Sequence, residues 1–427
     1  MRVRFFSLGC RVNQVDAQAL RGLFAREGFE PVEQGDAEVL VVNSCTVTSM
    51  ADRKTRQLVR RLRREQPAAV LVLTGCLPQA SPEAAALLTE ADLVTGAREQ
   101  EQLPARVREW LKTGRRVVSI PDFEPKTPFE GEPAERFDDS FQRAYLKIED
   151  GCDRYCAYCV IPRARGPVRS RPPNEVAAET ARLAAAGYRE LVLTGINLSR
   201  YGAGEGLRLT DAVRAACEIP GDFRVRLGSV EPVLLGEADY QALSGLERLC
   251  PQFHLSLQSG CDDTLARMNR RYTTAEYLNT VRIIRSLFNN PSITTDLIVG
   301  FPGETDAEFE QTCRFVRALG LLRGHVFEYS PRAKTAAAAM PGQLAPEVKR
   351  ARAKTLSAIC RESGAAFAAA QVGRTVRVLA EATGGGYTDN YLFVTFSGER
   401  PPAGALVSAR LVGVDADGCV AEWEKRP

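Results

Sequence analysis

The feature that most constrains this chain is a run of three cysteines within eight residues, Cys152, Cys156 and Cys159. A loop this short cannot join its thiols to one another without strain, but it can fold around one compact inorganic object and present three thiolates to three metal atoms. A 4Fe-4S cube fits that geometry. Three protein ligands leave the fourth iron open, so a small chelating cofactor can bind there.

Zinc and a disulfide are the alternatives for these thiols. Structural zinc takes four nitrogen or sulfur ligands, usually as two close pairs, whereas the two histidines, His254 and His325, lie far away in the sequence. A disulfide needs an oxidising compartment. The apolar run at the amino terminus is too short for a signal peptide, and the sequence has no apolar run of about 18 residues. We therefore expect a cytoplasmic protein that does not enter a membrane.

Composition places the chain among ordinary soluble globular proteins. Its 427 residues are 44% hydrophobic and 26% charged, which is enough for two or three domains with their own cores. The net charge of +3 creates no global attraction to nucleic acid, so any such binding must come from local clusters of basic residues.

The first 114 residues alternate short β-branched runs with helical patterns, which predicts a parallel α/β sheet. Strands are expected at residues 3–8, 39–43 and 70–74, and helices at 14–27, 48–65 and 82–89.

Three cysteines, Cys10, Cys45 and Cys76, follow directly on the ends of these three strands. Because parallel strands bring their carboxyl ends to one edge, the three thiols should converge in the crevice where such sheets bind ligands. This predicts a second three-thiolate cluster site with one open iron. The alternative is that each thiol is a small buried hydrophobe. The cysteines at 217, 250, 261, 313, 360 and 419 are most simply core or surface thiols, and Cys261, which follows Gln258-Ser-Gly, could lie near the barrel mouth.

The expected helix at 48–65 is strongly basic. Its apolar residues Leu58, Val59 and Leu62 are expected to pack inward. Its basic residues form either a solvated face or a surface for RNA phosphates. They are Arg53, Lys54, Arg56, Arg60, Arg61, Arg63 and Arg64.

A Pro-rich, acidic stretch without periodicity, residues 115–137, is typical of a linker. After it, in residues 138–369, strand and helix alternate six times, with strands expected at 144–148, 190–194, 224–227, 254–257, 292–299 and 324–329. Six such units predict a partial (β/α)6 barrel whose chemistry lies at the carboxyl ends of its strands.

The strand ends of this barrel carry polar or flexible groups that could hold an amino-acid-like cofactor. Strand ends are polar in any case, which is the competing interpretation. The candidates for cofactor binding are Tyr158, Gly195, Asn197, Glu231 and Gln258. Two basic runs could also lie near the mouth, where they would either bind phosphate or be solvated. They are Arg163, Arg165, Arg169 and Arg171, then Arg267, Arg270 and Arg271.

The last segment, residues 370–427, predicts a small all-β barrel, with strands at 372–381, 387–396, 405–412 and 419–423 and a turn at 384–386. Some of its aromatic residues could stack on bases, while about half must form the core. They are Tyr387, Tyr391, Phe393 and Phe396.

These motifs resemble the radical S-adenosylmethionine methylthiotransferases over essentially the full length. The resemblance rests on the settings Leu-Gly-Cys-Arg-Val-Asn, Asn-Ser-Cys-Thr-Val-Thr and Thr-Gly-Cys around Cys10, Cys45 and Cys76, and on the loop from Cys152 to Cys159. The last segment looks like the family's RNA-binding TRAM domain. Stretches such as Leu227-Gly-Ser-Val-Glu-Pro and His254-Leu-Ser-Leu-Gln-Ser-Gly-Cys resemble the bacterial threonylcarbamoyladenosine tRNA methylthiotransferases most.

The resemblance implies two 4Fe-4S clusters and S-adenosyl-L-methionine as cofactors. Cys152, Cys156 and Cys159 would hold the cluster that cleaves S-adenosylmethionine to a radical, and Cys10, Cys45 and Cys76 the cluster that carries the sulfur. The methylthio group would go to C2 of the adenine beside the anticodon of tRNA, with an electron donor of the flavodoxin or ferredoxin type and a separate sulfur source. Isopentenyladenosine tRNA or a ribosomal protein stays open as the substrate, as does a non-catalytic RNA-binding protein with structural metal.

Overall fold

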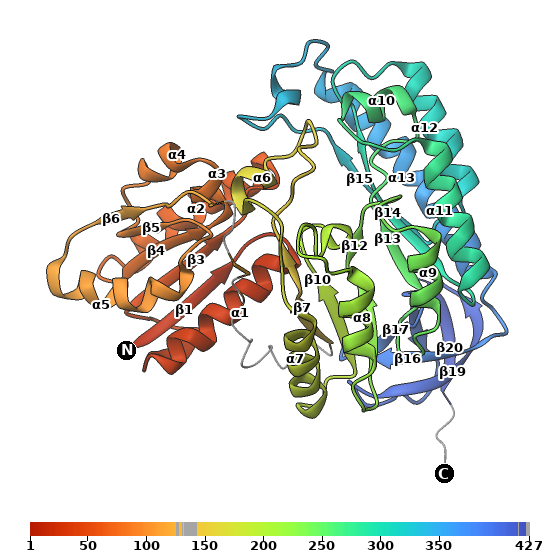
Figure 1. Cartoon of the computed structure of the whole chain (residues 1–427), viewed down its shortest axis with the longest axis horizontal. Helices are drawn as coiled ribbons and strands as arrows, with labels where there is room; N and C mark the ends of the chain where they lie inside the picture. The colour runs from red at the N-terminus through yellow and green to blue at the C-terminus, as the bar shows by residue number, and fades with distance from the viewer. Residues whose placement is uncertain (125–127, 130, 132–142, 417, 424–427) are drawn as a thin grey trace. The chain divides into compact units, whose positions relative to one another are not determined.

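The computed structural model describes residues 1–124, 128–129, 131, 143–416 and 418–423 (Figure 1). These residues form two compact units. The first contains Met1–Phe137, Glu149–Arg171 and Ser330–Ala338, and the second contains Asp138–Ile148, Pro172–Tyr329 and Ala339–Pro427. Much of the expected linker at 115–137 lies outside the described residues.

The first unit is built on a six-stranded parallel sheet in the order β2-β1-β3-β4-β5-β6. The three strands expected from the sequence are its centre, and the sheet continues to Ser119, beyond residue 114. The strands are β1 (Arg2–Ser7), β2 (Glu30–Val32), β3 (Val39–Ser44), β4 (Val70–Gly75), β5 (Leu93–Thr95) and β6 (Val117–Ser119). The helices are α1 (Arg11–Arg26), α2 (Ser49–Glu65), α3 (Cys76–Ala80), α4 (Pro82–Ala86) and α5 (Leu103–Thr113), with a 3-10 turn at Gln100–Gln102.

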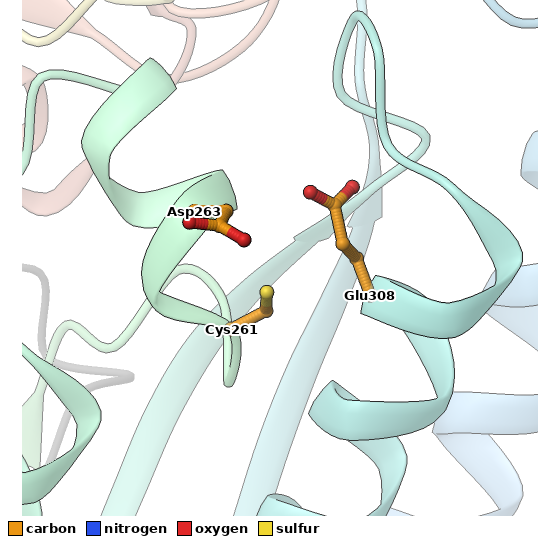
Figure 2. Close-up of side chains that lie close together, drawn as sticks. All are labelled: Cys261, Asp263 and Glu308. Atoms are coloured by element: carbon orange, nitrogen blue, oxygen red, sulfur yellow. The ribbon is translucent and has the colours of Figure 1, made fainter.

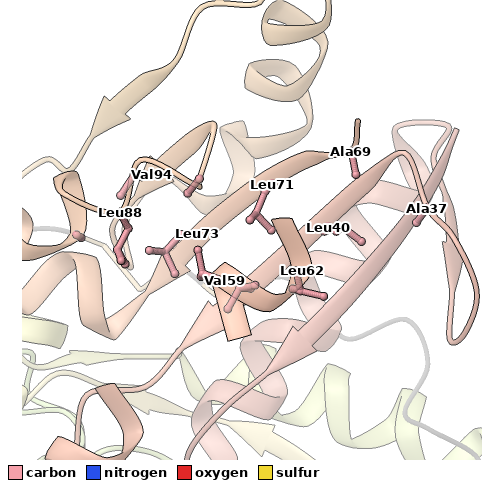
Figure 3. Close-up of a cluster of buried hydrophobic side chains, with 12 residues drawn as sticks. Ala37, Leu40, Val59, Leu62, Ala69, Leu71, Leu73, Leu88 and Val94 are labelled. Atoms are coloured by element: carbon pink, nitrogen blue, oxygen red, sulfur yellow. The ribbon is translucent and has the colours of Figure 1, made fainter. Parts of the chain in front are cut away.

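Both faces of this sheet are covered, because side chains along a strand alternate between them. In β3, Val39 and Val41 pack with α1 and α5 on one face. Leu40 and Val42 pack with α2 on the other face, in the cluster of Figure 3. Each fully buried Leu or Val side chain contributes about 1.5–3 kcal/mol. The hydrophobic runs of β3 and β4 are therefore the part of the sequence that fixes this layer order.

Helix α2 begins where Thr48 accepts a hydrogen bond from the Ala51 N–H through its side chain at 3.2 Å, a side-chain cap of the kind that starts helices. Val59 and Leu62 are buried, as expected, and Leu58 is partly buried against the same cluster. The basic side chains Arg53, Lys54, Arg61 and Arg64 are exposed. The helix thus presents a charged outer face.

The second unit confirms the partial barrel. Its parallel strands form two hydrogen-bonded sheets, β11-β10-β7 and β12-β13-β14-β15, and a parallel bridge from Val225 to Leu249 lies beside β11. The strands are β7 (Arg143–Lys147), β10 (Glu190–Thr194), β11 (Arg224–Leu227), β12 (Ser229–Val230), β13 (Gln252–Leu255), β14 (Ser292–Val299) and β15 (Arg323–Glu328). The helices are α7 (Pro173–Ala185), α8 (Leu209–Cys217), α9 (Glu237–Ser244), α10 (Asp262–Arg267), α11 (Thr274–Leu287), α12 (Asp306–Leu319) and α13 (Pro346–Ala369), with 3-10 turns at Leu198–Arg200 and Ala336–Ala339.

The carboxyl-terminal strands close into a five-stranded barrel in the order β16-β17-β18-β20-β19. One expectation was wrong, because the strand expected at 387–396 is two strands joined by a turn at which Tyr391 has φ +68°. Gly385 and Gly386, expected in a turn, lie in the first of these strands, where a Cβ at Gly386 would lie 2.4 Å from the Leu379 carbonyl oxygen. The strands are β16 (Thr375–Ala380), β17 (Gly385–Thr388), β18 (Phe393–Phe396), β19 (Leu406–Val414) and β20 (Cys419–Trp423).

The aromatic residues of this barrel divide between its core and its rim. Phe396 is buried in the core. Tyr387 and Tyr391 stack on each other at 4.7 Å between ring centroids, and the guanidinium of Arg226 from the central strands lies 4.8 Å from the Tyr391 ring. In the parts of the chain that are described, no helix combines the length and the apolar character needed to cross a membrane.

Candidate functional site

The loop with Cys152, Cys156 and Cys159 belongs to the first unit. It leaves β8 (Glu149–Asp150), continues into the short helix α6 (Ile161–Arg165) and returns through β9 (Arg169–Ser170), which pairs with β8 in antiparallel fashion. The three cysteines are half-buried.

Backbone hydrogen bonds fix the shape of this loop. The Cys152 N–H donates to the Gly166 carbonyl at 3.1 Å, and the Cys159 N–H donates to the Cys156 carbonyl at 2.9 Å. Gly151 has φ +88°, and a Cβ there would lie 1.9 Å from the Pro167 carbonyl oxygen. Glycine is therefore required for the hairpin to close directly before Cys152.

The thiols of Cys10, Cys45 and Cys76 converge at the carboxyl edge of the sheet, as the strand order predicted. Cys10 precedes α1, Cys45 follows β3, and Cys76 begins α3. Gly9 lies against Cys45 so closely that a Cβ at position 9 would be 2.5 Å from its sulfur. The Val47 N–H points at the Cys45 sulfur at 3.4 Å.

Asn13 connects two of these thiols. Its Oδ1 lies 3.8 Å from the Cys10 sulfur and 3.6 Å from the Cys76 sulfur. Its amide nitrogen donates to the carbonyls of Leu8 (3.0 Å) and Ser44 (2.7 Å), which fixes Oδ1 as the atom that faces the thiols. One buried amide thus holds two of the three strand ends at the site.

A buried arginine also reaches this group. Arg165 of α6 directs its Nε–H at the Cys76 sulfur at 3.2 Å and donates through Nη2 to Asn13 Oδ1 at 2.6 Å. Its Nη1 bonds Asp16 at 2.6 Å and Asp150 at 3.3 Å. Burial alone would lower the pKa of Arg165, but Cys76, Asp16 and Asp150 raise it well above its ordinary value. The guanidinium therefore stays charged.

The donor set fits a cluster with three thiolate ligands. All twelve cysteines lie among the described residues, and none of them forms a disulfide there. Burial raises the pKa of Cys45, and it raises the pKa of Cys76 to about 12, with Arg165 opposing both shifts. Metal binding by the Cys45 and Cys76 thiols must therefore release protons.

The two groups of cysteines are close neighbours within the first unit. Cys76 and Ala80 of α3 pack against Val160 and Ala164 of the segment that follows the Cys152–Cys159 loop. Figure 1 shows α3 beside α6. The sequence placed these groups in different domains, whereas the loop and the strand-end thiols share one compact unit.

The loop Ser330–Ala338 joins the same unit. Arg332 donates to Asp52 at 2.9 Å and to the Thr46 hydroxyl at 2.5 Å, and Thr46 follows Cys45 directly. The Ala337 N–H donates to the Ala157 carbonyl at 2.8 Å, inside the Cys152–Cys159 loop. This segment therefore makes hydrogen bonds next to Cys45 and inside the Cys152–Cys159 loop.

The candidate cofactor contacts fall into both units. Tyr158 is half-buried in the cysteine loop of the first unit. In the second unit, the structure brings Asn197 and Glu231 together, since the Asn197 amide donates to Glu231 at 2.9 Å. Gln258 follows β13 with φ +69°, a strained conformation for a residue other than glycine. Gly195 follows the end of β10.

The basic run after the cysteine loop was predicted to bind phosphate or to be solvated, and neither alternative holds for three of its members. Arg165, Arg169 and Arg171 are buried, whereas Arg163 is exposed. Arg169 donates to the Arg165 carbonyl at 2.9 Å, and Arg171 to the Gly131 carbonyl at 2.8 Å. These side chains stabilise the β8–β9 hairpin through hydrogen bonds to other residues of the first unit. The sequence did not show that Asn13, Asp16 and Asp150 would be the hydrogen-bond and ion-pair partners of these arginines.

Cys261 lies in a separate group with Asp263 and Glu308, whose ligand atoms are within 4.8 Å of one another (Figure 2). Both Glu308 carboxylate oxygens accept hydrogen bonds from Arg267, at 2.8 Å each. The hydrogen bond from Arg267 is the main reason that the pKa of Glu308 is lowered. The ion pair between Arg267 of α10 and Glu308 of α12 thus connects these two helices and accounts for the position of Glu308 in this group. The other five cysteines outside the two trios are buried, as expected.

A shallow groove of about 450 Å³ crosses the outer face of α2, lined by Gln57, Arg60, Arg63, Arg64 and Glu90. Arg63 bonds the backbone carbonyls of Glu90 and Ala69 at 2.9 Å each, so part of the basic face is used internally.

Family models and relatives match this chain over most of its length. Residues 146–316 match the Radical SAM superfamily, and residues 2–96 match a family described as Uncharacterized protein family UPF0004. The threonylcarbamoyladenosine tRNA methylthiotransferase MtaB of Thermotoga maritima is 35% identical, covering 98% of this chain and 96% of its own. The same enzyme of Bacillus subtilis is 32% identical, covering 96% and 93%. The tRNA-2-methylthio-N(6)-dimethylallyladenosine synthase of Pelotomaculum thermopropionicum is also 32% identical, covering 96% and 95%.

Among solved structures, the radical S-adenosylmethionine methyltransferase TsrM from Kitasatospora setae superposes with a TM-score of 0.61 at 15% identity, covering 79% of this chain and 77% of that one. This agreement concerns the fold. The near full-length relatives identify the family: the chain belongs to the radical S-adenosylmethionine tRNA methylthiotransferases, enzymes that use S-adenosylmethionine and 4Fe-4S clusters.

Proposed function

We propose that this chain transfers a methylthio group to C2 of N6-threonylcarbamoyladenosine beside the anticodon of tRNA, giving 2-methylthio-N6-threonylcarbamoyladenosine. Two relatives that carry the corresponding name are 32–35% identical over nearly the whole chain. The observation that carries the proposal is the placement of two groups of three reduced cysteines in one compact unit, with α3 packed against the segment that includes α6. A reaction that needs both a radical and a sulfur source requires two such sites close together.

In this proposal, Cys152, Cys156 and Cys159 hold the cluster that binds S-adenosylmethionine, and Cys10, Cys45 and Cys76 hold a second cluster. When bound, these groups would supply the radical and carry the sulfur, which the reaction needs because an aromatic C–H does not react with any side-chain base. The protein contributes the thiolates, the groups that donate hydrogen bonds to them, and a site in which the thiols are buried or half-buried, apart from that of Cys10. Tyr158, Gly195, Asn197, Glu231 and Gln258 are proposed to orient the S-adenosylmethionine.

The substrate is compatible with such a site, because an anticodon-loop base is already unpaired and little energy is needed to present it to an enzyme. The exposed basic residues of α2 would contact tRNA phosphates. The carboxyl-terminal barrel would add RNA contacts. A flavodoxin or ferredoxin would deliver electrons, a separate donor would supply the sulfur, and the reaction would take place in the cytoplasm, where the tRNA is.

Mass spectrometry of tRNA nucleosides tests the substrate. A strain that lacks the gene should lose 2-methylthio-N6-threonylcarbamoyladenosine, accumulate the unmodified N6-threonylcarbamoyladenosine and recover the product with the wild-type gene. The complementing variant Cys156→Ala, which removes one loop thiol, should not restore it. An unchanged nucleoside profile in the deletion strain would reject the proposed substrate.

A second candidate substrate is N6-dimethylallyladenosine in tRNA. A relative named tRNA-2-methylthio-N(6)-dimethylallyladenosine synthase is 32% identical over 96% of this chain. Purified, reconstituted enzyme should be given two tRNAs that differ only in the N6 substituent. Turnover of the dimethylallyl tRNA alone would transfer the assignment to this second candidate.

A further inference from the structure

The guanidinium of Arg165 makes a contact with a cysteine sulfur that is not needed to neutralise its charge. Asp16 and Asp150 already balance its charge, through contacts of 2.6 and 3.3 Å to Nη1. Its Nε–H nevertheless points at the sulfur of Cys76, at 3.2 Å. The side chain is 3% exposed, so water does not screen these contacts.

The surroundings hold Arg165 in this orientation. Its Nη2 donates to Asn13 Oδ1 at 2.6 Å, and Asn13 is itself fixed by the carbonyls of Leu8 and Ser44. The guanidinium is planar, so bonds at Nη1 and Nη2 determine where its Nε–H points. The direction of the Nε–H toward Cys76 is thus set by three other residues.

A charged donor at a ligand sulfur has a predictable electrical effect. Hydrogen bonds to the sulfurs and the net charge around a cluster set its reduction potential. A positive group near the sulfur stabilises the state with one more electron, and the effect is larger in a buried site.

We propose that Arg165 is a positioning residue for the site of Cys10, Cys45 and Cys76: it orients the Cys76 sulfur as a ligand and raises the reduction potential of the cluster held there. This inference rests on the proposed function, which assigns those three cysteines as ligands. Arg165 follows the Cys152–Cys159 loop in the chain, so the segment that carries one group of thiols also supplies the charge for the other.

A purely structural role for Arg165 must be separated from this one, because Arg165 also ties α6 to Asp150 before the loop. Arg352 offers the matched control. It is also a buried arginine, 6% exposed, and its guanidinium bonds Glu304 and Asp306 at 2.6 Å each, all within the second unit.

The experiment is a potentiometric titration, followed by electron paramagnetic resonance, of the anaerobically reconstituted full-length protein. The signal that changes when S-adenosylmethionine is added marks the loop cluster and leaves the other signal for analysis. Arg165→Gln should lower the equilibrium constant for reduction of the second cluster about tenfold, which is a shift of about 59 mV to more negative potential for one electron. Arg165→Lys, which keeps the charge but loses the Nε–H, should shift less.

Two further variants sharpen the result. Asp16→Asn removes a negative charge beside Arg165 and should shift the potential in the opposite direction. Arg352→Gln should lower the melting temperature and leave the potential unchanged. Loss of the second cluster from Arg165→Gln, with a melting temperature no lower than that of Arg352→Gln, also supports the proposal, because it shows that Cys76 needs Arg165 to act as a ligand.

Retention of the cluster with an unchanged potential in Arg165→Gln would overturn the inference and leave Arg165 as a brace of the fold. If the wild-type protein binds a single cluster, the ligand assignment of Cys10, Cys45 and Cys76 fails, and the role of Arg165 fails with it. Iron analysis and Mössbauer spectra of the wild type separate these two failures.

Discussion

Glu190 and Arg224 face each other at the first positions of the neighbouring strands β10 and β11, fully buried, with Arg224 Nε donating to the Glu190 carboxylate at 2.7 Å. Arg226 and Arg143 bind the same carboxylate at 2.9 and 3.0 Å. Arg224 also reaches Asp389 of the carboxyl-terminal barrel at 2.7 Å. This network lies at the amino-terminal edge of the central strands, the end of a β/α barrel that serves stability rather than catalysis.

Glu190→Gln should therefore destabilise the protein strongly. The substitution leaves buried arginines without their shared counter-charge, and removing one partner of a buried ion pair costs about 3–5 kcal/mol. Thermal or urea unfolding of the wild type and the variant measures the difference. The matched control is Glu310→Gln in α12, where the carboxylate pairs with Arg314 four residues away at 3.7 Å and both side chains are exposed, so the loss should be below about 1 kcal/mol.

The same carboxylate predicts a pH dependence. Burial alone would raise the pKa of Glu190, but Arg226, Arg224 and Arg143 lower it well below its ordinary value of 4.5. A lowered folded-state pKa contributes stability that is fully present above the ordinary pKa and is lost as the pH falls toward the folded-state pKa. The stability difference between wild type and Glu190→Gln should thus be constant above about pH 5 and shrink below about pH 4.5. A difference that grows on acidification would contradict this account.

Single cysteine substitutions should separate the two groups of thiols. Cys156→Ala should abolish reductive cleavage of S-adenosylmethionine, because it removes one of the three thiolates proposed to hold the loop cluster. Cys45→Ala should retain that cleavage and abolish methylthio transfer, with iron content reduced by about half. Cys217→Ala, a buried cysteine of α8, is the control and should retain both clusters. Product analysis and iron determination on each purified variant decide the matter, and transfer by Cys45→Ala would argue against a second cluster at that site.

The contact between Arg332 and Asp52 should hold the segment Ser330–Ala338 in place. Arg332→Gln is expected to cost about 2 kcal/mol, since it removes the closer of two cations from the mostly buried Asp52 carboxylate and leaves Arg56 at 3.9 Å. Hydrogen exchange should rise in residues 330–338 and around Thr46. The double variant Arg332→Gln/Asp52→Asn should recover part of the loss, and independent, additive losses would show that the two side chains do not interact.

The exposed basic face of α2 predicts salt-dependent tRNA binding. Lys54→Gln/Arg64→Gln should weaken binding about tenfold at low salt and make the logarithmic salt dependence shallower by ~0.7–0.9 for each phosphate that the variant no longer neutralises. Lys112→Gln/Arg115→Gln is the matched control, because both residues are exposed in and after α5, on the opposite face of the sheet. Filter binding across a salt series measures both variants, and equal effects would show that charge alone, rather than the α2 surface, governs binding.

Regular patterns in the sequence were sufficient for much of this fold. The β-branched runs of β3 and β4 are buried along their whole length, so their hydrophobicity predicts them directly. Cys45 and Cys76 follow those runs, and the rule that parallel strands end at one edge was enough to bring their thiols together. The helix expected at 48–65 likewise begins at its first residue, Thr48, whose side chain caps α2.

Other features depend on partners that no local pattern reveals. Arg165 lies 149 residues from Asp16 and 89 residues from Cys76, so a basic run in the sequence gives no sign that one member is buried between them. The split of the expected strand at 387–396 has a similar origin. Asp389 and Asn390 turn there because they bond Arg224 of β11 and the Asn290 carbonyl in the loop before β14.

The first unit is built from three separate stretches of the chain, and these leave the ribosome at different times during translation. Residues Met1–Ser119 contain the whole six-stranded sheet and can fold as soon as they leave the ribosome. Such a nascent chain already carries the thiols of Cys10, Cys45 and Cys76, yet the guanidinium that contacts Cys76 and the segment Ser330–Ala338 are translated later. The arginine that contacts Cys76 and the arginine that bonds Thr46 beside Cys45 can therefore complete the surroundings of these thiols only after translation has passed Ala338.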